Sequence, residues 1–139
     1  MDNLINIGDV VGPGLGEDGN LSEANGEVRK AADTIQKGQL LRIDNNGQWV
    51  VGSVDTYENA TVVAMATENG NIGDDVLGIY IGKVSVPSTA TDSVALFLGS
   101  DGFSTETATT VVGEYITRIG KGLFQDTIYV QCEEPVEVT

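Results

Sequence analysis

Residues 94–107 read VALFLGSDGFSTET, and the order of residue types in this stretch decides the fold. An apolar run that favours a strand ends in the turn sequence Ser100–Gly102, and a threonine-rich run follows it. Aspartate and glycine tolerate the backbone angles of tight turns, so the pattern predicts a strand, a turn and a second strand. The alternative is a ligand-binding loop that presents Asp101.

The same pattern occurs once more in the chain. Residues 40–49, LLRIDNNGQW, align with residues 95–104, ALFLGSDGFS, at an offset of 55, and Gly47 falls on Gly102. This internal repeat predicts two β-hairpins of similar design. The two hairpins share a turn, but their aspartates do not fall on equivalent positions. We therefore expect Asp44 and Asp101 to form hydrogen bonds with the backbone of their own turns.

From Leu40 onward the chain consists of short runs typical of strands, separated by turn residues. The predicted strands lie within 39–44, 48–54, 61–67, 75–86, 93–99, 113–119 and 126–132, and the predicted turns are 45–47, 69–73, 100–102 and 120–122. Strands at this spacing without intervening helices predict an all-β barrel or sandwich. Within 75–86 the alternation of apolar residues changes phase near Gly82, which predicts a β-bulge.

The chain divides into three parts. Residues 1–33 are predicted to form a flexible N-terminal arm with a short helical or irregular segment, 34–132 a β domain, and 133–139 an acidic C-terminal tail. Residues 27–39 have the only helical composition. The arm begins with an apolar patch that we expect to dock on a partner, or alternatively to join the domain's own sheet as a first strand; the patch is Leu4, Ile5, Ile7, Val10 and Val11.

Charge excludes several classes of partner. Twenty-one Asp and Glu residues face seven Lys and Arg, which gives a net charge of −14, and the chain has no histidine. Such a surface repels phosphate backbones and anionic lipids, so we expect neither nucleic acid nor a membrane as a partner. Cys132 is the single cysteine, so no disulfide can form within the chain, and we expect a small buried residue there.

No pattern in the sequence predicts catalysis, a cofactor or a metal. The acidic doublets at 74–75 and 133–134 could in principle act in glycoside cleavage, but adjacent residues on a strand point to opposite faces. Calcium and zinc spacings are absent, although the carboxylates of 16–20 and 73–75 could hold an adventitious hard cation. The aromatic residues could form a carbohydrate platform, but we expect them to fill the core; they are Trp49, Phe97, Phe103, Tyr115, Phe124 and Tyr129.

The region from Lys37 to Cys132 resembles the capsid decoration (cement) and head-fibre proteins of tailed bacteriophages. The segments that carry the resemblance are KGQLLRIDNNGQW, NATVVAMATEN, GDDVLGIYIGKVSVP, LFLGSDGFSTE and GEYITRIGKGLFQDTIYVQ. They cover about two-thirds of the chain and leave out the N-terminal arm.

The resemblance implies a small β-barrel or β-tulip-like module on the outer surface of the virion's icosahedral capsid. Such proteins are commonly homotrimers that bridge neighbouring subunits of the major capsid protein, and they are not enzymes. We therefore expect a decoration protein whose capsid-binding residues are the apolar patch of the arm. The alternative is an adhesive or glycan-binding β module of a fibre or a cell surface.

Overall fold

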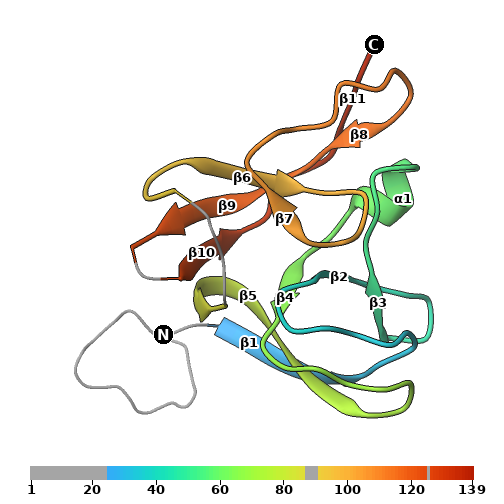
Figure 1. The fold of residues 1–139 in the computed structure, drawn as a ribbon. Helices are drawn as coiled ribbons and strands as arrows, with labels where there is room; N and C mark the ends of the chain where they lie inside the picture. Colours follow the sequence, from blue (N-terminus) through green and yellow to red (C-terminus); the bar gives the residue numbers. More distant parts are fainter. Residues whose placement is uncertain (1–24, 87–90, 125) are drawn as a thin grey trace.

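The computed structural model describes residues 25–86, 91–124 and 126–139, and nearly all of their regular structure is β (Figure 1). The single helix, α1 (Tyr57–Ala60), is one turn long. The strands are β1 (Asn25–Lys30), β2 (Leu40–Ile43), β3 (Trp49–Val51), β4 (Ala64–Ala66), β5 (Asp75–Ser85), β6 (Ala95–Leu98), β7 (Ser104–Thr105), β8 (Tyr115–Ile116), β9 (Arg118–Leu123), β10 (Thr127–Gln131) and β11 (Val136–Glu137). The all-β prediction is confirmed.

One curled antiparallel sheet contains most of the strands. Its order is β3-β2-β4-β5-β10-β9-β6-β7, and β1 also pairs with β5. Figure 1 shows β6 and β9 on one side of the molecule and β2 and β4 on the other, so that the sheet curls into a half-barrel. A second, two-stranded sheet joins β8 to β11.

The concave side of the sheet holds the first core cluster. Side chains from strands that are distant in the sheet order meet there, as Leu40 of β2 and Leu96 of β6 do. The cluster is almost entirely aliphatic and comprises Leu40, Val54, Ala60, Val62, Met65, Ile79, Val84, Val86, Leu96, Leu98, Ile119, Ile128 and Val130. Burial of these side chains supplies most of the driving force for folding.

A second core cluster lies on the other face of β2, β4 and β5. Neighbouring residues alternate between the two clusters, so that Leu40 points into the first and Leu41 into the second. The second cluster is covered by the chain that follows β1, and it comprises Ala31, Ile35, Leu41, Trp49, Ala64, Ala66 and Val76. A strand between two covered faces becomes apolar at every position, which explains the continuous apolar runs at 62–66.

The predicted phase change in β5 is confirmed. Ile79 and Val84 have opposite parity along the strand, yet both belong to the first core cluster. Between them, Gly82 adopts a φ of +135°. The register of β5 with β1 also shifts here, because Asn25 pairs with Ile81 and the next residue with Ile79.

The helical prediction for residues 27–39 is wrong. Asn25–Lys30 form β1, and the chain beyond it is irregular, with isolated bridges from Ala31 to Trp49 and from Ile35 to Gly70. The amide of Ile35 donates to the carbonyl oxygen of Gly70 at 2.8 Å instead of to a residue four positions earlier. Contacts with distant strands thus outweigh a modest local preference for helix.

Two smaller predictions also need correction. Gly120–Gly122 do not form a turn, because they lie inside β9, whose own turn to β10 comes after Leu123. The segment 133–139, predicted as a tail, contains β11, which pairs with β8 through Val136 and Ile116. The other predicted turns, at 45–47, 69–73 and 100–102, separate strands as expected.

Candidate functional site

The loop that follows β6 borders a cleft of about 470 Å³. One wall is the turn of the β6–β7 hairpin, and the other is the threonine-rich chain that leads to β8. Hydroxyl and carboxylate groups alternate with a few apolar side chains along the walls, which are formed by Val54, Leu98, Gly99, Ser100, Asp101, Thr105, Thr107, Thr109, Val111 and Glu114.

The two hairpin turns have the same backbone hydrogen bonds. In the β2–β3 turn the amide of Asp44 donates to the oxygen of Gln48 at 2.9 Å, and Gly47 donates back to Asp44 at 3.0 Å. In the β6–β7 turn Gly99 donates to Phe103 at 2.8 Å, and Gly102 donates to Gly99 at 3.1 Å. These partners correspond at the offset of 55, so the predicted repeat of two hairpins is confirmed.

Both turn aspartates bond their own backbone, as predicted. The Oδ1 atom of Asp44 accepts from the amides of Asn46 and Gln48, at 2.8 and 2.9 Å. The Oδ1 atom of Asp101 accepts from the amide of Phe103 at 3.0 Å. The loop at 100–102 is therefore a turn whose outer side also lines a cleft.

The remaining polar groups of the cleft are largely bound to one another. The Thr109 hydroxyl donates to the Glu114 carboxylate, and the Thr105 hydroxyl accepts from the amide of Thr107 at 3.2 Å. Such groups can exchange hydrogen bonds with a hydroxylated ligand. A general base would have to be a carboxylate, since the chain has no histidine.

The acidic doublets serve the fold. Asp74 accepts from the amide of Asn71 at 2.9 Å and so closes the turn before β5, while Asp75 pairs with Lys30 at 2.7 Å. At the other doublet, Glu133 lies 3.9 Å from Arg118. In the part of the chain that the structure describes, no three His, Cys, Asp or Glu side chains gather closely enough to hold a metal ion.

Asp55 is held at the start of α1 by two side chains. The Ser53 hydroxyl donates to its carboxylate, and Nδ2 of Asn59 donates to the same oxygen at 2.9 Å. These hydrogen bonds, that of Ser53 first, lower the pKa of Asp55 below its usual range. The next residue, Thr56, caps the helix by accepting from the amide of Asn59.

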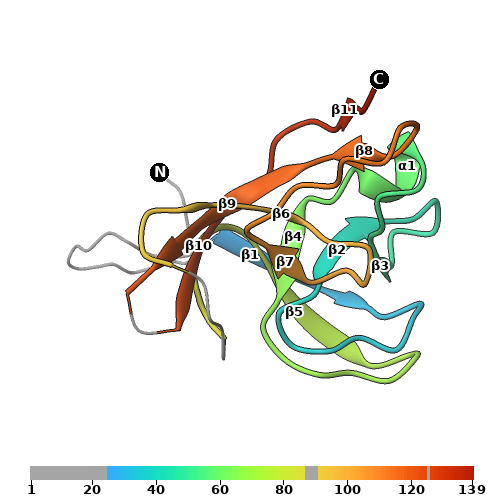
Figure 2. The same ribbon diagram turned by 45° about the horizontal axis from the view of Figure 1, so that its top comes forward.

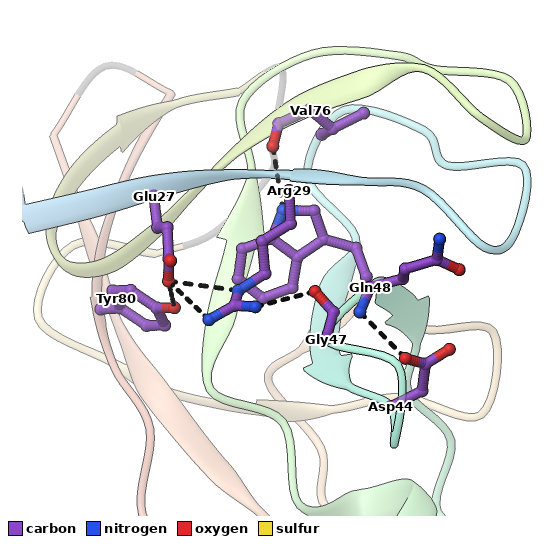
Figure 3. Close-up of polar contacts among 8 residues, drawn as sticks. Glu27, Arg29, Asp44, Gly47, Gln48, Val76 and Tyr80 are labelled. Atoms are coloured by element: carbon purple, nitrogen blue, oxygen red, sulfur yellow. Dashed lines mark hydrogen bonds and ion pairs between the residues drawn. The ribbon is translucent and has the colours of Figure 1, made fainter.

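An arginine fastens β1 to the body of the sheet (Figure 3). The Arg29 guanidinium lies 5.7 Å from the centre of the Trp49 ring and donates to the Gly47 oxygen at 2.7 Å. It also forms an ion pair at 2.9 Å with Glu27, whose carboxylate accepts a hydrogen bond from the Tyr80 hydroxyl. Beneath it, the Trp49 indole donates to a backbone oxygen of β5 at 2.9 Å.

The predicted contact residues of the arm, Leu4, Ile5, Ile7, Val10 and Val11, lie outside the described residues. Among the predicted core aromatics, Trp49 is fully buried and Tyr115 packs against the first core cluster. Phe97, Phe103 and Tyr129 are partly buried, and Phe124 is 74% exposed. The prediction was wrong for these four because aliphatic side chains fill both clusters.

Cys132 packs against the first core cluster, as expected for a small apolar residue. Its burial raises the pKa of the thiol to about 12, so the reactive thiolate is scarce at neutral pH. No helix in residues 25–86, 91–124 and 126–139 combines the length and hydropathy needed to span a membrane.

No protein-family model matches the chain, and no curated protein matches its sequence.

Sequence inspection missed the wall of the cleft that Thr105, Thr107, Thr109 and Glu114 form. The alternation of threonine at 105, 107 and 109 is the signal that could have indicated it, because alternate residues of an extended chain lie on one side. The inspection also missed Arg29 and Tyr80. Each finds its partners on distant strands, which no local pattern reveals.

Proposed function

We propose that this protein is a non-catalytic decoration protein, which binds the outer surface of a tailed-phage head as a homotrimer and stabilises contacts between major capsid subunits. The resemblance described above supports this proposal, and so does the compact β module. Partner binding would come from surfaces and not from a reactive centre.

The observation that carries the proposal is a contrast between two groups of side chains. The carboxylates in the turns are already hydrogen-bonded, whereas several large apolar side chains are exposed. Asp44 and Asp101 are occupied by their own backbone. Large apolar residues are instead exposed at separate places, with Ile72 at 69%, Val112 at 74% and Phe124 at 74%. Adjoining exposed apolar side chains are what marks a surface that binds a partner, and the neighbours Val111 and Val112 are 56% and 74% exposed.

The net charge of −14 supports a position outside the head. A negative surface keeps a protein soluble at high copy number, and it would be repelled by the packaged DNA inside. Many copies on one particle would also add avidity to modest individual contacts.

The N-terminal residues have a firm base from which to reach a partner. β1 is fastened by Arg29 and begins at Asn25. A chain from Asn25 back to Val11 could span at most about 50 Å when extended. Residues 4–11 could thus contact a capsid subunit beside the one on which the β domain lies.

The test is co-sedimentation with empty heads of the phage that carries this gene. The full chain should sediment with the heads at saturating occupancy. Deletion of residues 1–12 should abolish binding, while circular dichroism and thermal unfolding of the truncated protein stay unchanged. Equal occupancy without residues 1–12 would overturn the assignment of the arm, and no binding by the full chain would overturn the proposed function.

A second candidate, glycan binding, is favoured by the hydroxyl-lined cleft. Sugar hydroxyls could exchange hydrogen bonds with Thr107, Asp101 and Glu114 beside apolar walls. This candidate expects glycan-array binding that Thr107→Val weakens, because the change removes one hydroxyl at nearly constant shape. Tyr57→Phe, which lies outside the cleft, is the matched control. Absence of binding to any glycan would reject this candidate.

A further inference from the structure

Three side chains form a basic row across the outer face of the sheet. Tyr129 of β10 pairs with Lys83 of β5 on one side and with Lys121 of β9 on the other. Paired residues of neighbouring strands project from the same face, about 5 Å apart. The neighbours of Tyr129 along the strand, Ile128 and Val130, point into the first core cluster, so the row faces away from it.

The strand segments around this row contain no acidic residue. Ile81–Ser85, Arg118–Leu123 and Thr127–Gln131 hold three of the seven Lys and Arg residues of the chain and no Asp or Glu. Both lysines of the row are exposed, and neither has an ion-pair partner in the described part of the chain. We call this surface the basic face and define it by Lys83, Lys121, Tyr129 and Ile81.

Apolar contact area accompanies the charge on the basic face. Ile81 lies two positions from Lys83 on the same side of β5 and is 41% exposed. A shallow pocket of about 180 Å³ lies beside Lys121 and Tyr129, and its lining also includes Arg118 and the carboxylate of Glu133, which lie 3.9 Å apart. A partner could therefore bury apolar groups here while it neutralises the two lysines.

The end of the molecule that α1, β8 and β11 form has an acidic character. In Figures 1 and 2, α1, β8 and β11 lie together, far from the turn between β9 and β10. Acidic and exposed apolar side chains alternate there. We call this end the acidic tip and define it by Tyr57, Glu58, Val111, Val112, Glu134, Val136 and Glu137.

We propose that the basic face of one copy binds the acidic tip of a second copy, so that the protein self-associates head to tail. Two molecules that each carry −14 repel one another through most of their surfaces. Contact between basic face and acidic tip opposes that repulsion, and the apolar residues of both surfaces supply affinity. Because two different surfaces meet, repeated contacts build a closed ring or an open filament.

The inference goes beyond the proposed function, because it assigns the surfaces of self-association and is measured without heads. The competing occupant of the basic face is the chain's own N-terminus. Residues 1–24 carry five acidic residues and no Lys or Arg. The residue that follows them, Asn25, pairs with Ile81 of the basic face.

Light scattering coupled to gel filtration at low salt tests the contact. The full chain should show a mass of several times the 14.6 kDa protomer. Lys83→Glu/Lys121→Glu should reduce it to the protomer mass. Lys37→Glu/Asn45→Asp/Asn46→Asp changes the net charge equally at exposed positions outside the basic face, so it should keep the full-chain mass. A full chain of protomer mass, or equal masses for the two variants, would overturn the proposal.

A charge swap identifies the partner surface. Glu134→Lys/Glu137→Lys alone should also give only protomers, because the new lysines of the tip repel Lys83 and Lys121 of the basic face on a second copy. When it is mixed with Lys83→Glu/Lys121→Glu, heavier species should form. The basic tip of one variant can then bind the acidic sheet face of the other. If the mixture stays at protomer mass, the acidic tip is not the partner. If removal of residues 1–24 abolishes association while the tip variant associates normally, the N-terminus is the occupant and the proposal is wrong.

Discussion

Gly120 shows how a single residue shapes this sheet. Its φ of +148° is a conformation that side chains other than glycine rarely adopt. A Cβ atom at this position would lie 1.9 Å from the carbonyl oxygen of Tyr129. Across β10, Val130 pairs with both Gly120 and Gly82, so two glycines with positive φ flank one strand where the sheet curls.

Substitution of Gly120 separates backbone strain from steric overlap. Gly120→Ala should lower the free energy of unfolding by more than about 3 kcal/mol, because strained backbone and overlap with Tyr129 act together. Gly73→Ala is the matched control, since Gly73 has a φ of +93° but nothing within 4 Å of the added methyl group. It should cost about 1 kcal/mol. Urea denaturation measures both values, and equal losses would contradict a role for close strand approach.

The same glycine marks what residue patterns predict poorly. The sequence predicts a turn at Gly120–Gly122 because glycine readily adopts the positive φ that tight turns need. The structure uses Gly120 for close approach of a neighbouring strand instead. Asp44 and Asp101 could be predicted as turn residues because their partners lie two to four positions away. A residue's role is readable from sequence when its partners are local.

At the scale of elements, the two hairpins and β1 differ in the origin of their stability. The hairpins follow from local signals: strand-forming runs and a Gly turn, repeated at an offset of 55. Residues 27–39 have a helical composition, yet their first four belong to β1, which becomes a strand through distant partners. These are Trp49, Gly47 and Tyr80, which surround Arg29 and Glu27. The sequence therefore predicts the hairpins and misses β1 and the cleft wall.

The contact between Tyr80 and Glu27 can be tested by pH. Burial, and then the hydrogen bond with Glu27, raises the pKa of Tyr80 above its ordinary value of about 10. The folded state thus favours the protonated phenol, and this contribution to stability is complete below pH 10 and lost as the pH rises through the folded-state pKa. Tyr80→Phe should cost at most about 1 kcal/mol at neutral pH, because the pair is partly exposed.

The decisive comparison is the slope of stability with pH. Between about pH 9 and pH 11 the wild-type protein should lose more stability than Tyr80→Phe does. Tyr57→Phe removes an exposed phenol and should keep the wild-type slope. The free energy of unfolding is measured by urea denaturation across this pH range. If it falls equally with pH in the wild type and in Tyr80→Phe, the contact does not couple the protonation of Tyr80 to stability.

At the scale of the whole molecule, a small curled sheet combines a strongly acidic surface with exposed apolar residues at separate places. The carboxylates of Asp44 and Asp101 accept hydrogen bonds from backbone amides, and the basic face places two exposed lysines on either side of Tyr129. Composition predicts the acidic surface, and the spacing of strand-forming runs and turns predicts the fold class. The positions of Lys83, Lys121 and Tyr129 in one row depend on strand register, which the sequence does not specify.

Cryo-electron microscopy of phage heads that contain or lack this protein tests the decoration proposal most directly. Heads that contain it should show added β-rich density of about 14.6 kDa per copy on the outer capsid surface, bridging neighbouring capsid subunits. Heads that lack it should lose this density and disassemble at a lower temperature. Identical outer surfaces and identical disassembly temperatures would contradict a decoration function.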